Sequence, residues 1–126
     1  MNTQLDEALE AFQCRDHHLG EEKLTKFMEE QACTDHVSVV ADRVERLFNE
    51  ASKTTEARLR LDLLRALKNP DMLPVDGGIM KACTAEFRLF SLDENDRVIG
   101  VRHEFVARYR LFVPWSGQKA CRCHPH

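Results

Sequence analysis

Residues 98–114 read VIGVRHEFVARYRLFVP, and their alternation decides the fold class. Apolar side chains occupy most odd positions from Ile99 to Val113, and charged side chains occupy most even positions from Arg102 to Arg110. A period of two is typical of a β-strand with one buried face. One regular strand of this length would extend roughly 53 Å, so we expect a bend or break, with Gly100 and Ala107 as the weakest points.

The preceding residues predict a partner for this strand. Residues 83–89 alternate with the same period, and the polar turn at 93–96 (DEND) has the length of a hairpin connection. Residues 69–80 (NPDMLPVDGGIM) predict a loop, because 76–78 carry a turn signal and Pro74 excludes a central strand. The C-terminal part, about 82–114, is therefore an antiparallel β-hairpin or small sheet.

Upstream of the loop the apolar period changes to that of helices. We expect a first helix that stops by Gly20 at the latest, a second over 21–32, and a third that begins at a cap on Thr34 or Asp35. Leucines at 59, 63, 64 and 67 predict a fourth helix over about 55–68, which ends before Pro70. The fold class is thus α+β, with a cluster of about four short helices followed by the β part.

Length and composition favour one domain over residues 1–126. Its parts are a helical part at about 3–68, a loop at 69–80, a β part at about 82–114 and a flexible tail at 116–126. A hydrophobic content of 43% with 31% charged residues excludes a disordered or a membrane class. Residues 1–13 are acidic and resemble no secretory signal, so we expect a cytoplasmic or nuclear protein without a membrane partner.

The charge is unevenly distributed. Residues 1–79 hold 10 basic and 16 acidic side chains, whereas residues 80–126 hold 8 basic and 5 acidic ones. A uniformly basic nucleic-acid binder is therefore excluded, but a basic face on the C-terminal part is not. Five cysteines, an odd number, favour reduced thiols over a disulfide framework.

Arginines at even positions define the first candidate site. A regular strand pair would place them on one sheet face beside aromatic rings, an arrangement that holds single-stranded nucleic acid. It is equally the solvated side of an ordinary sheet, and Glu86 and Glu104 between the arginines favour ion pairs. The predicted binding face consists of Arg88, Arg102, Arg108, Arg110, Phe112 and Trp115.

Cysteine and histidine define the second candidate site. Two Cys-x-x-His pairs and a Cys-x-Cys-His run near the end of the chain carry the thiolate and imidazole ligands that zinc accepts. The alternative is that Cys33 is a small buried hydrophobe and that the last residues are a frayed tail. The candidate zinc ligands are Cys14, His17, Cys33, His36, Cys121, Cys123 and His124. No other cofactor is indicated.

An enzyme has little support. The chain has neither a phosphate-binding Gly-x-x-x-x-Gly-Lys loop nor a Gly-x-Ser-x-Gly elbow. Cys83 lies on the inward face of its strand, where burial would raise the pKa of its thiol. His103 lies on the apolar face of its strand, which predicts a satisfied core or interface histidine. We therefore expect a non-enzymatic protein-interaction or regulatory module, acting as an adaptor or as a homodimer. The alternative is a small nucleic-acid-binding protein that uses the arginine face and a zinc-tied terminus.

Overall fold

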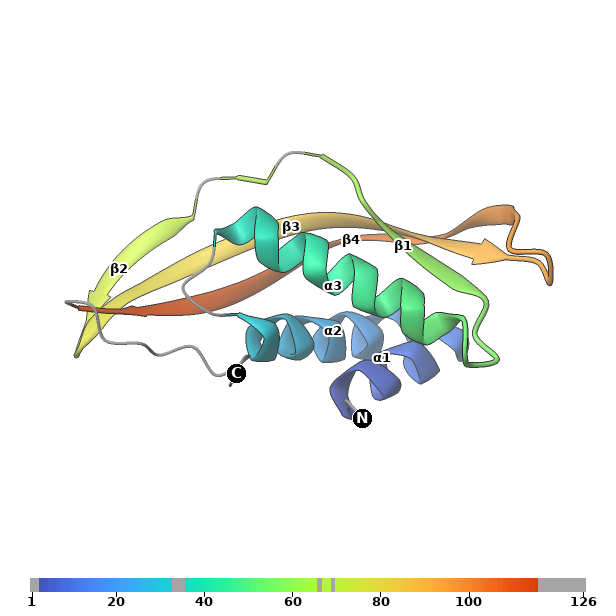
Figure 1. The fold of residues 1–126 in the computed structure, drawn as a ribbon, viewed down its shortest axis with the longest axis horizontal. Coiled ribbons are helices and arrows are strands. Elements are labelled where there is room, and N and C mark those ends of the chain that lie inside the picture. The colour runs from blue at the N-terminus through green and yellow to red at the C-terminus, as the bar shows by residue number, and fades with distance from the viewer. Residues whose placement is uncertain (1–2, 33–35, 66, 69, 116–126) are drawn as a thin grey trace.

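A computed structural model describes residues 3–32, 36–65, 67–68 and 70–115. Over these residues the chain is α+β, with three helices followed by one antiparallel sheet of four strands (Figure 1). The helices are α1 (Thr3–Gln13), α2 (His17–Gln31) and α3 (Val37–Ser52). The strands are β1 (Leu59–Leu63), β2 (Asp71–Val75), β3 (Gly78–Leu92) and β4 (Val98–Pro114). The tail predicted at 116–126 lies outside the described residues.

The first two helices are separated at Arg15, whose φ of 62° breaks the helical path. Asp16 then caps α2, because its side chain accepts the Leu19 N–H at 3.2 Å. Gly20 was predicted as a helix stop, but it lies inside α2. Its lack of a side chain serves close packing instead, since a Cβ there would lie 2.6 Å from the ring carbons of Phe12.

The apolar stripe of α3 is buried as predicted. Val40, Val44 and Phe48 are fully enclosed, and Leu47 packs partly buried against the same core. The helix begins after His36, whose Nδ1 accepts the Ser38 N–H at 3.3 Å. The caps predicted at residues 34 and 35 lie outside the described residues.

The predicted fourth helix is wrong, because its residues form β1. Leu59 and Leu61 alternate into the core, and the strand pairs antiparallel with residues 87–91 of β3. The leucine spacing fits a helix as well as it fits a short buried strand, so the period alone did not decide between them. The long-range pairing with β3 did.

The predicted loop at 69–80 contains a further hairpin. Strand β2 pairs with the start of β3 around a turn in which Gly77 has φ 83°, a conformation that favours glycine. Pro74 lies in β2, which pairs only with β3 among the described strands, so its placement agrees with the exclusion of a central strand.

The long strand β3 organises the sheet. On one side it pairs with β1 and β2, each along a different part of its length, and on the other side with β4 from Gly78↔Pro114 to Leu92↔Val98. The predicted bend or break in β4 takes the form of two register shifts, opposite Leu89/Phe90 and Ser91/Leu92. Both lie at the Gly100 end of β4, and the ladder passes Ala107 without interruption.

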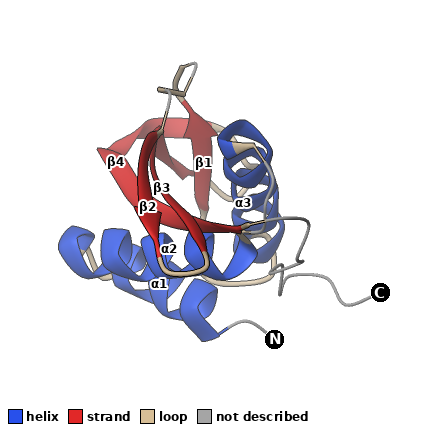
Figure 2. Ribbon diagram, turned by 90° about the vertical axis from the view of Figure 1, so that its left-hand side faces the viewer, coloured by secondary structure: helices blue, strands red, loops and turns tan. Residues whose placement is uncertain are grey.

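The core lies between the helices and one face of this twisted sheet. Figure 2 shows α3 beside β1, with α1 and α2 below β4. A chain of aromatic contacts crosses the layers, from Phe48 through Phe12 to Phe105 and Phe87, with ring centroids 5.6–6.2 Å apart. Most even positions of β3 and β4 lie on the opposite face, outside the buried core.

Candidate interaction surface

The outer face of the sheet carries charges of both signs in register. We define the outer face by even-numbered residues of three strands. These are residues 60–62 of β1, 84–90 of β3 and 104–112 of β4. One cross-strand row contains Asp62, Arg88 and Glu104, and Arg88 Nε lies 3.3 Å from Glu104 Oε2. The charges of this row therefore largely compensate one another.

Two further ion pairs continue this pattern. Arg65 lies 2.9 Å from Glu86, and Arg60 lies 3.2 Å from Asp62 while its guanidinium stands 5.0 Å from the ring centroid of Phe90. The arginines on this part of the outer face thus meet a carboxylate or an aromatic ring of their own chain. Such pairs between exposed groups contribute little stability, but they lower the positive field that would attract a phosphate backbone.

Three of the four predicted arginines share the outer face. Arg88 is paired with Glu104, and Arg110, which is 70% exposed, lies 3.9 Å from Glu29 at the edge of α2. Arg108 has no ion-pair partner among the described residues. The outer face therefore offers one uncompensated arginine rather than a basic platform.

Arg102 does not share this face, which corrects the prediction of a common arginine surface. The register shift opposite Leu89/Phe90 turns it toward the helices. There its Nη1 donates to the Phe12 carbonyl at 2.7 Å, and its Nε donates to Ser91 Oγ at 2.9 Å. Arg102 thus fastens the last turn of α1 to the sheet.

The two predicted aromatic residues lie at the other end of β4. Phe112 is half-buried opposite Met80, close to the turn at Gly77 and Gly78. A Cβ at Gly78 would lie 2.2 Å from the Val113 carbonyl oxygen, so glycine is required there. Trp115 is exposed, and its N–H donates to the Gly77 carbonyl at 2.9 Å.

Strand β4 has an open edge. In an antiparallel pair, successive residues direct their backbone groups alternately toward the partner and away from it. Trp115 donates its N–H to the Gly77 carbonyl, so these two residues are a hydrogen-bonded pair in the β3–β4 register. Every second residue of β4, from Val113 back to His103, therefore directs its backbone N–H and C=O toward β3. The open edge, roughly 26 Å long, consists of the backbone groups of Glu104, Val106, Arg108, Arg110 and Phe112.

A groove runs along part of this edge, between β4 and α2. It has a volume of about 440 Å³ and is lined by Val106, Arg108 and Arg110 on the strand side. On the α2 side, His18, Glu22 and Glu29 contribute charged or polar walls. The groove thus lies beside three even residues of β4, whose backbone groups belong to the open edge.

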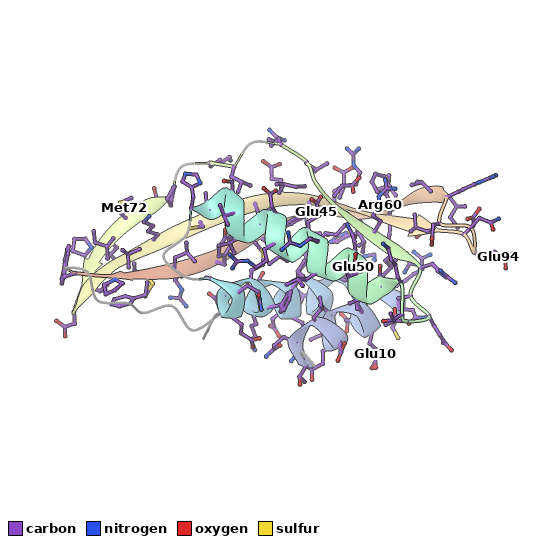
Figure 3. The ribbon with its side chains drawn as sticks, in the orientation of Figure 1. Glu10, Glu45, Glu50, Arg60, Met72 and Glu94 are labelled. Atoms are coloured by element: carbon purple, nitrogen blue, oxygen red, sulfur yellow. The ribbon has the colours of Figure 1, made fainter. Side chains whose placement is uncertain are left out.

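The opposite edge of the sheet is protected by α3. Asn49 Nδ2 donates to the Leu61 carbonyl at 3.1 Å, and Asn49 Oδ1 accepts the Leu61 N–H at 2.8 Å. Glu45 Oε2 accepts the Leu63 N–H, and Figure 3 shows Glu45 on α3 beside β1. Desolvation raises the pKa of Glu45. Side chains thus take the place of a further strand along β1.

The candidate zinc ligands are only partly within the described residues. Cys14 is exposed, His17 lies at the start of α2, and His36 caps α3 with its Nδ1. Among the described residues, no three His, Cys, Asp or Glu side chains are grouped so that they could hold a metal ion. The remaining candidates, Cys33, Cys121, Cys123 and His124, lie outside that part of the chain, so the zinc site stays a prediction.

A cluster of polar side chains joins α2 to β4. The sequence analysis did not identify these residues as a group. His103 Nε2 pairs with Glu21 Oε2, and the ring of His17 stacks on His103 with centroids 4.3 Å apart. Burial, and then the neighbouring His103 and Arg102, lower the pKa of His17. The prediction of a satisfied histidine at 103 is confirmed, but its partner is 82 positions away in the chain.

Two further titratable groups, Cys83 and Tyr109, are buried in this fold. Burial raises the pKa of the Cys83 thiol, as predicted. Burial also raises the pKa of Tyr109, whose hydroxyl donates to the Val37 carbonyl at 3.1 Å. The raised pKa of each group favours its protonated form.

Comparison of the chain with protein families, with curated proteins and with solved structures returns no match in any of the three. No helix among the described residues is long and apolar enough to cross a lipid bilayer.

Proposed function

We propose that this chain is a non-enzymatic protein-interaction module, an adaptor or regulator that recognises another polypeptide through the open edge of β4. The observation that carries the proposal is a row of five backbone positions, from Glu104 to Phe112, that pair with no other described strand and lie beside a groove. An exposed strand edge is a template for a further strand, and natural proteins usually cover or interrupt it.

The other edges of this sheet support the proposal by contrast. The edge of β1 is covered by Asn49 and Glu45. Strand β2 has five residues and contains Pro74, which has no N–H to offer. Strand β4 is long, has no proline before its last residue and pairs only with β3 among the described strands, with α2 beside it across the groove. A recognition role would explain why, among the described residues, the long edge of β4 has neither a pairing strand nor the capping side chains found along β1.

The nucleic-acid alternative has weaker support. A phosphate-binding platform needs several uncompensated cations on one surface. Here Arg88 and Arg110 are paired with carboxylates, and Arg102 is bonded to Phe12 on the helix side. We therefore place the protein partner first. Reduced thiols such as the exposed Cys14 favour the cytoplasm or nucleus as the compartment.

A photo-cross-linking amino acid at position 106 tests this function. In cells, it should form covalent adducts with polypeptide, because the side chain at this position borders the open edge. The matched control carries the same amino acid at Met72, an exposed residue of β2 at the far end of the sheet (Figure 3). Adducts only with nucleic acid, or equal protein adducts from both positions, would contradict the proposal.

A further inference from the structure

We propose that the chain docking on the β4 edge is a second copy of this protein, joined by antiparallel pairing of the two β4 strands about Val106. This inference rests on the proposed function and adds to it the identity of the partner. A two-fold axis at Val106 would pair the outward backbone groups of Val106 with those of its symmetry mate. The same register brings Glu104 opposite Arg108 of the other copy, twice.

The side chains of this segment are self-complementary in that register. Val106 is 38% exposed and would meet the other copy's valine at the axis. Arg108, which has no carboxylate partner among the described residues, would gain Glu104 of the other copy. Glu104 already meets Arg88, so each end of the pairing becomes a row of alternating charges, Arg88–Glu104–Arg108. Cross-strand pairs of opposite charge stabilise such ladders.

A different register shows why the axis is placed at Val106. An axis at Arg108 would put two arginines directly opposite each other and would face Val106 with Arg110. Like charges directly opposite destabilise a strand pair, so that register is disfavoured. Of these two registers, the charges of the open edge therefore favour the axis at Val106.

A charge exchange across the axis tests the inference. Sedimentation velocity on the purified full chain should show a concentration-dependent dimer. Glu104→Arg and Arg108→Glu should each raise the dimer dissociation constant about tenfold or more, because each places like charges opposite each other. An equimolar mixture of the two variants should associate again, since the exchanged charges are complementary in the mixed pair. No other register predicts this restoration.

The backbone contribution has its own matched pair of variants. Val106→Pro removes an N–H that points to the open edge, so it should abolish the dimer without breaking the β3–β4 ladder. Val106→Ala keeps that N–H and should keep most of the association. Circular dichroism establishes whether each variant is folded. If Val106→Pro does not fold, the mixture of Glu104→Arg and Arg108→Glu still tests the pairing of the two β4 strands.

Three results would overturn the inference. They are a chain that stays monomeric at millimolar concentration, a dimer indifferent to these changes, and charge variants that fail to associate when mixed. A monomer whose position 106 still cross-links to a different polypeptide would overturn the second copy as partner and leave the proposed function standing. A monomer without such cross-links would overturn both.

Discussion

Gly20 fills a position where α2 and the end of α1 come closest. Helices ordinarily gain stability when glycine is replaced by alanine, by roughly 0.5–1 kcal/mol. Here the added methyl group would lie 2.6 Å from two ring carbons of Phe12, a fully buried side chain that packs against Phe48 and Phe105. The steric cost should therefore exceed the gain in helix propensity.

We predict that Gly20→Ala destabilises the protein by about 1–3 kcal/mol, the usual range for overpacking a core. Urea unfolding followed by circular dichroism measures the change. Gly100→Ala is the matched control, because no atom lies within 4 Å of the added carbon, and it should stay within about 0.5 kcal/mol of the wild type. A stabilised Gly20→Ala would mean that the Phe12 ring moves freely.

His17 gives the fold a dependence on pH. Its pKa is lowered in the folded state, first by burial and then by His103 and Arg102, from an ordinary value of 6.5. The unfolded chain therefore binds more protons than the folded chain between the lowered pKa and pH 6.5. In that window stability rises with pH, so it is lost as the pH falls from 7.

We predict that the urea midpoint of the wild type falls between pH 7 and pH 5.5, and that His17→Phe reduces this fall. Phenylalanine keeps a ring for stacking on His103 and removes the titrating group. Matched unfolding curves at the two pH values, each for both proteins, measure the difference. An identical pH dependence in both proteins would show that His17 does not contribute.

At the scale of the elements, Arg102 connects the end of α1 to the bulged part of β4. Its two donors satisfy the Phe12 carbonyl at 2.7 Å and Ser91 Oγ at 2.9 Å. Burial lowers the pKa of Arg102 without changing its charge near neutrality. Helix ends depend on such partners, because their last carbonyls have none within the helix.

We predict that Arg102→Ala costs about 1–3 kcal/mol, the range for leaving a partly buried acceptor unsatisfied. Arg97→Ala is the control, since Arg97 is exposed in the turn before β4 and its side chain has no bond to another described residue. Chemical denaturation of the two variants compares them. If Arg102→Ala and Arg97→Ala had the same free energy of unfolding, the two hydrogen bonds of Arg102 would not contribute to stability.

The same residues show how far sequence reasoning reaches. Alternation placed Cys83, Phe87 and Tyr109 on the buried face of the sheet, because a period of two depends only on local geometry. It could not place Arg102, since a bulge shifts the register and only the pairing with β3 reveals it. Nor could it join His103 to Glu21, which are brought together only by the packing of α2 on β4.

The prediction of a helix in place of β1 was wrong for a related reason. Its leucines satisfy a helical period, and the side chains that hold it as a strand lie on α3. The open edge of β4 was also missed as a site, although its signal was present in the sequence. A long alternating strand whose closing proline comes only at Pro114 predicts an edge available for pairing.

Asn49 of α3 bonds both backbone groups of Leu61 and so caps the outer edge of β1. We predict that Asn49→Ala destabilises the protein by about 1–3 kcal/mol, because both backbone groups of Leu61 lose their partner. Asn49→Asp keeps the acceptor and should cost less. Thermal or urea unfolding compares these with Glu50→Ala, a control on the exposed side of α3 whose ion pair with Lys53 is solvated (Figure 3).

On the scale of the whole molecule, one cluster of buried side chains spans all three helices and strands β1, β3 and β4. Phe48 on α3 lies in its middle, fully enclosed and in edge contact with Phe12 at 6.2 Å. We predict that Phe48→Ala costs about 3–5 kcal/mol, because the cavity left by the ring cannot be refilled in a packed interior. Val39 lies on the same helix but is 45% exposed, so Val39→Ala should cost less than about 1 kcal/mol.

Two probes of the same urea transition then test whether the layers unfold together. Circular dichroism at 222 nm reports the helices, and the fluorescence of Trp115, the single tryptophan, reports the far end of the β3–β4 pair. Because the Phe48 ring contacts Phe12, which in turn contacts Phe105 of β4, its loss should shift both midpoints by the same amount. A shift of the helical signal alone would show that the helices and the sheet unfold as separate units, so that the long β3–β4 pair stands without them.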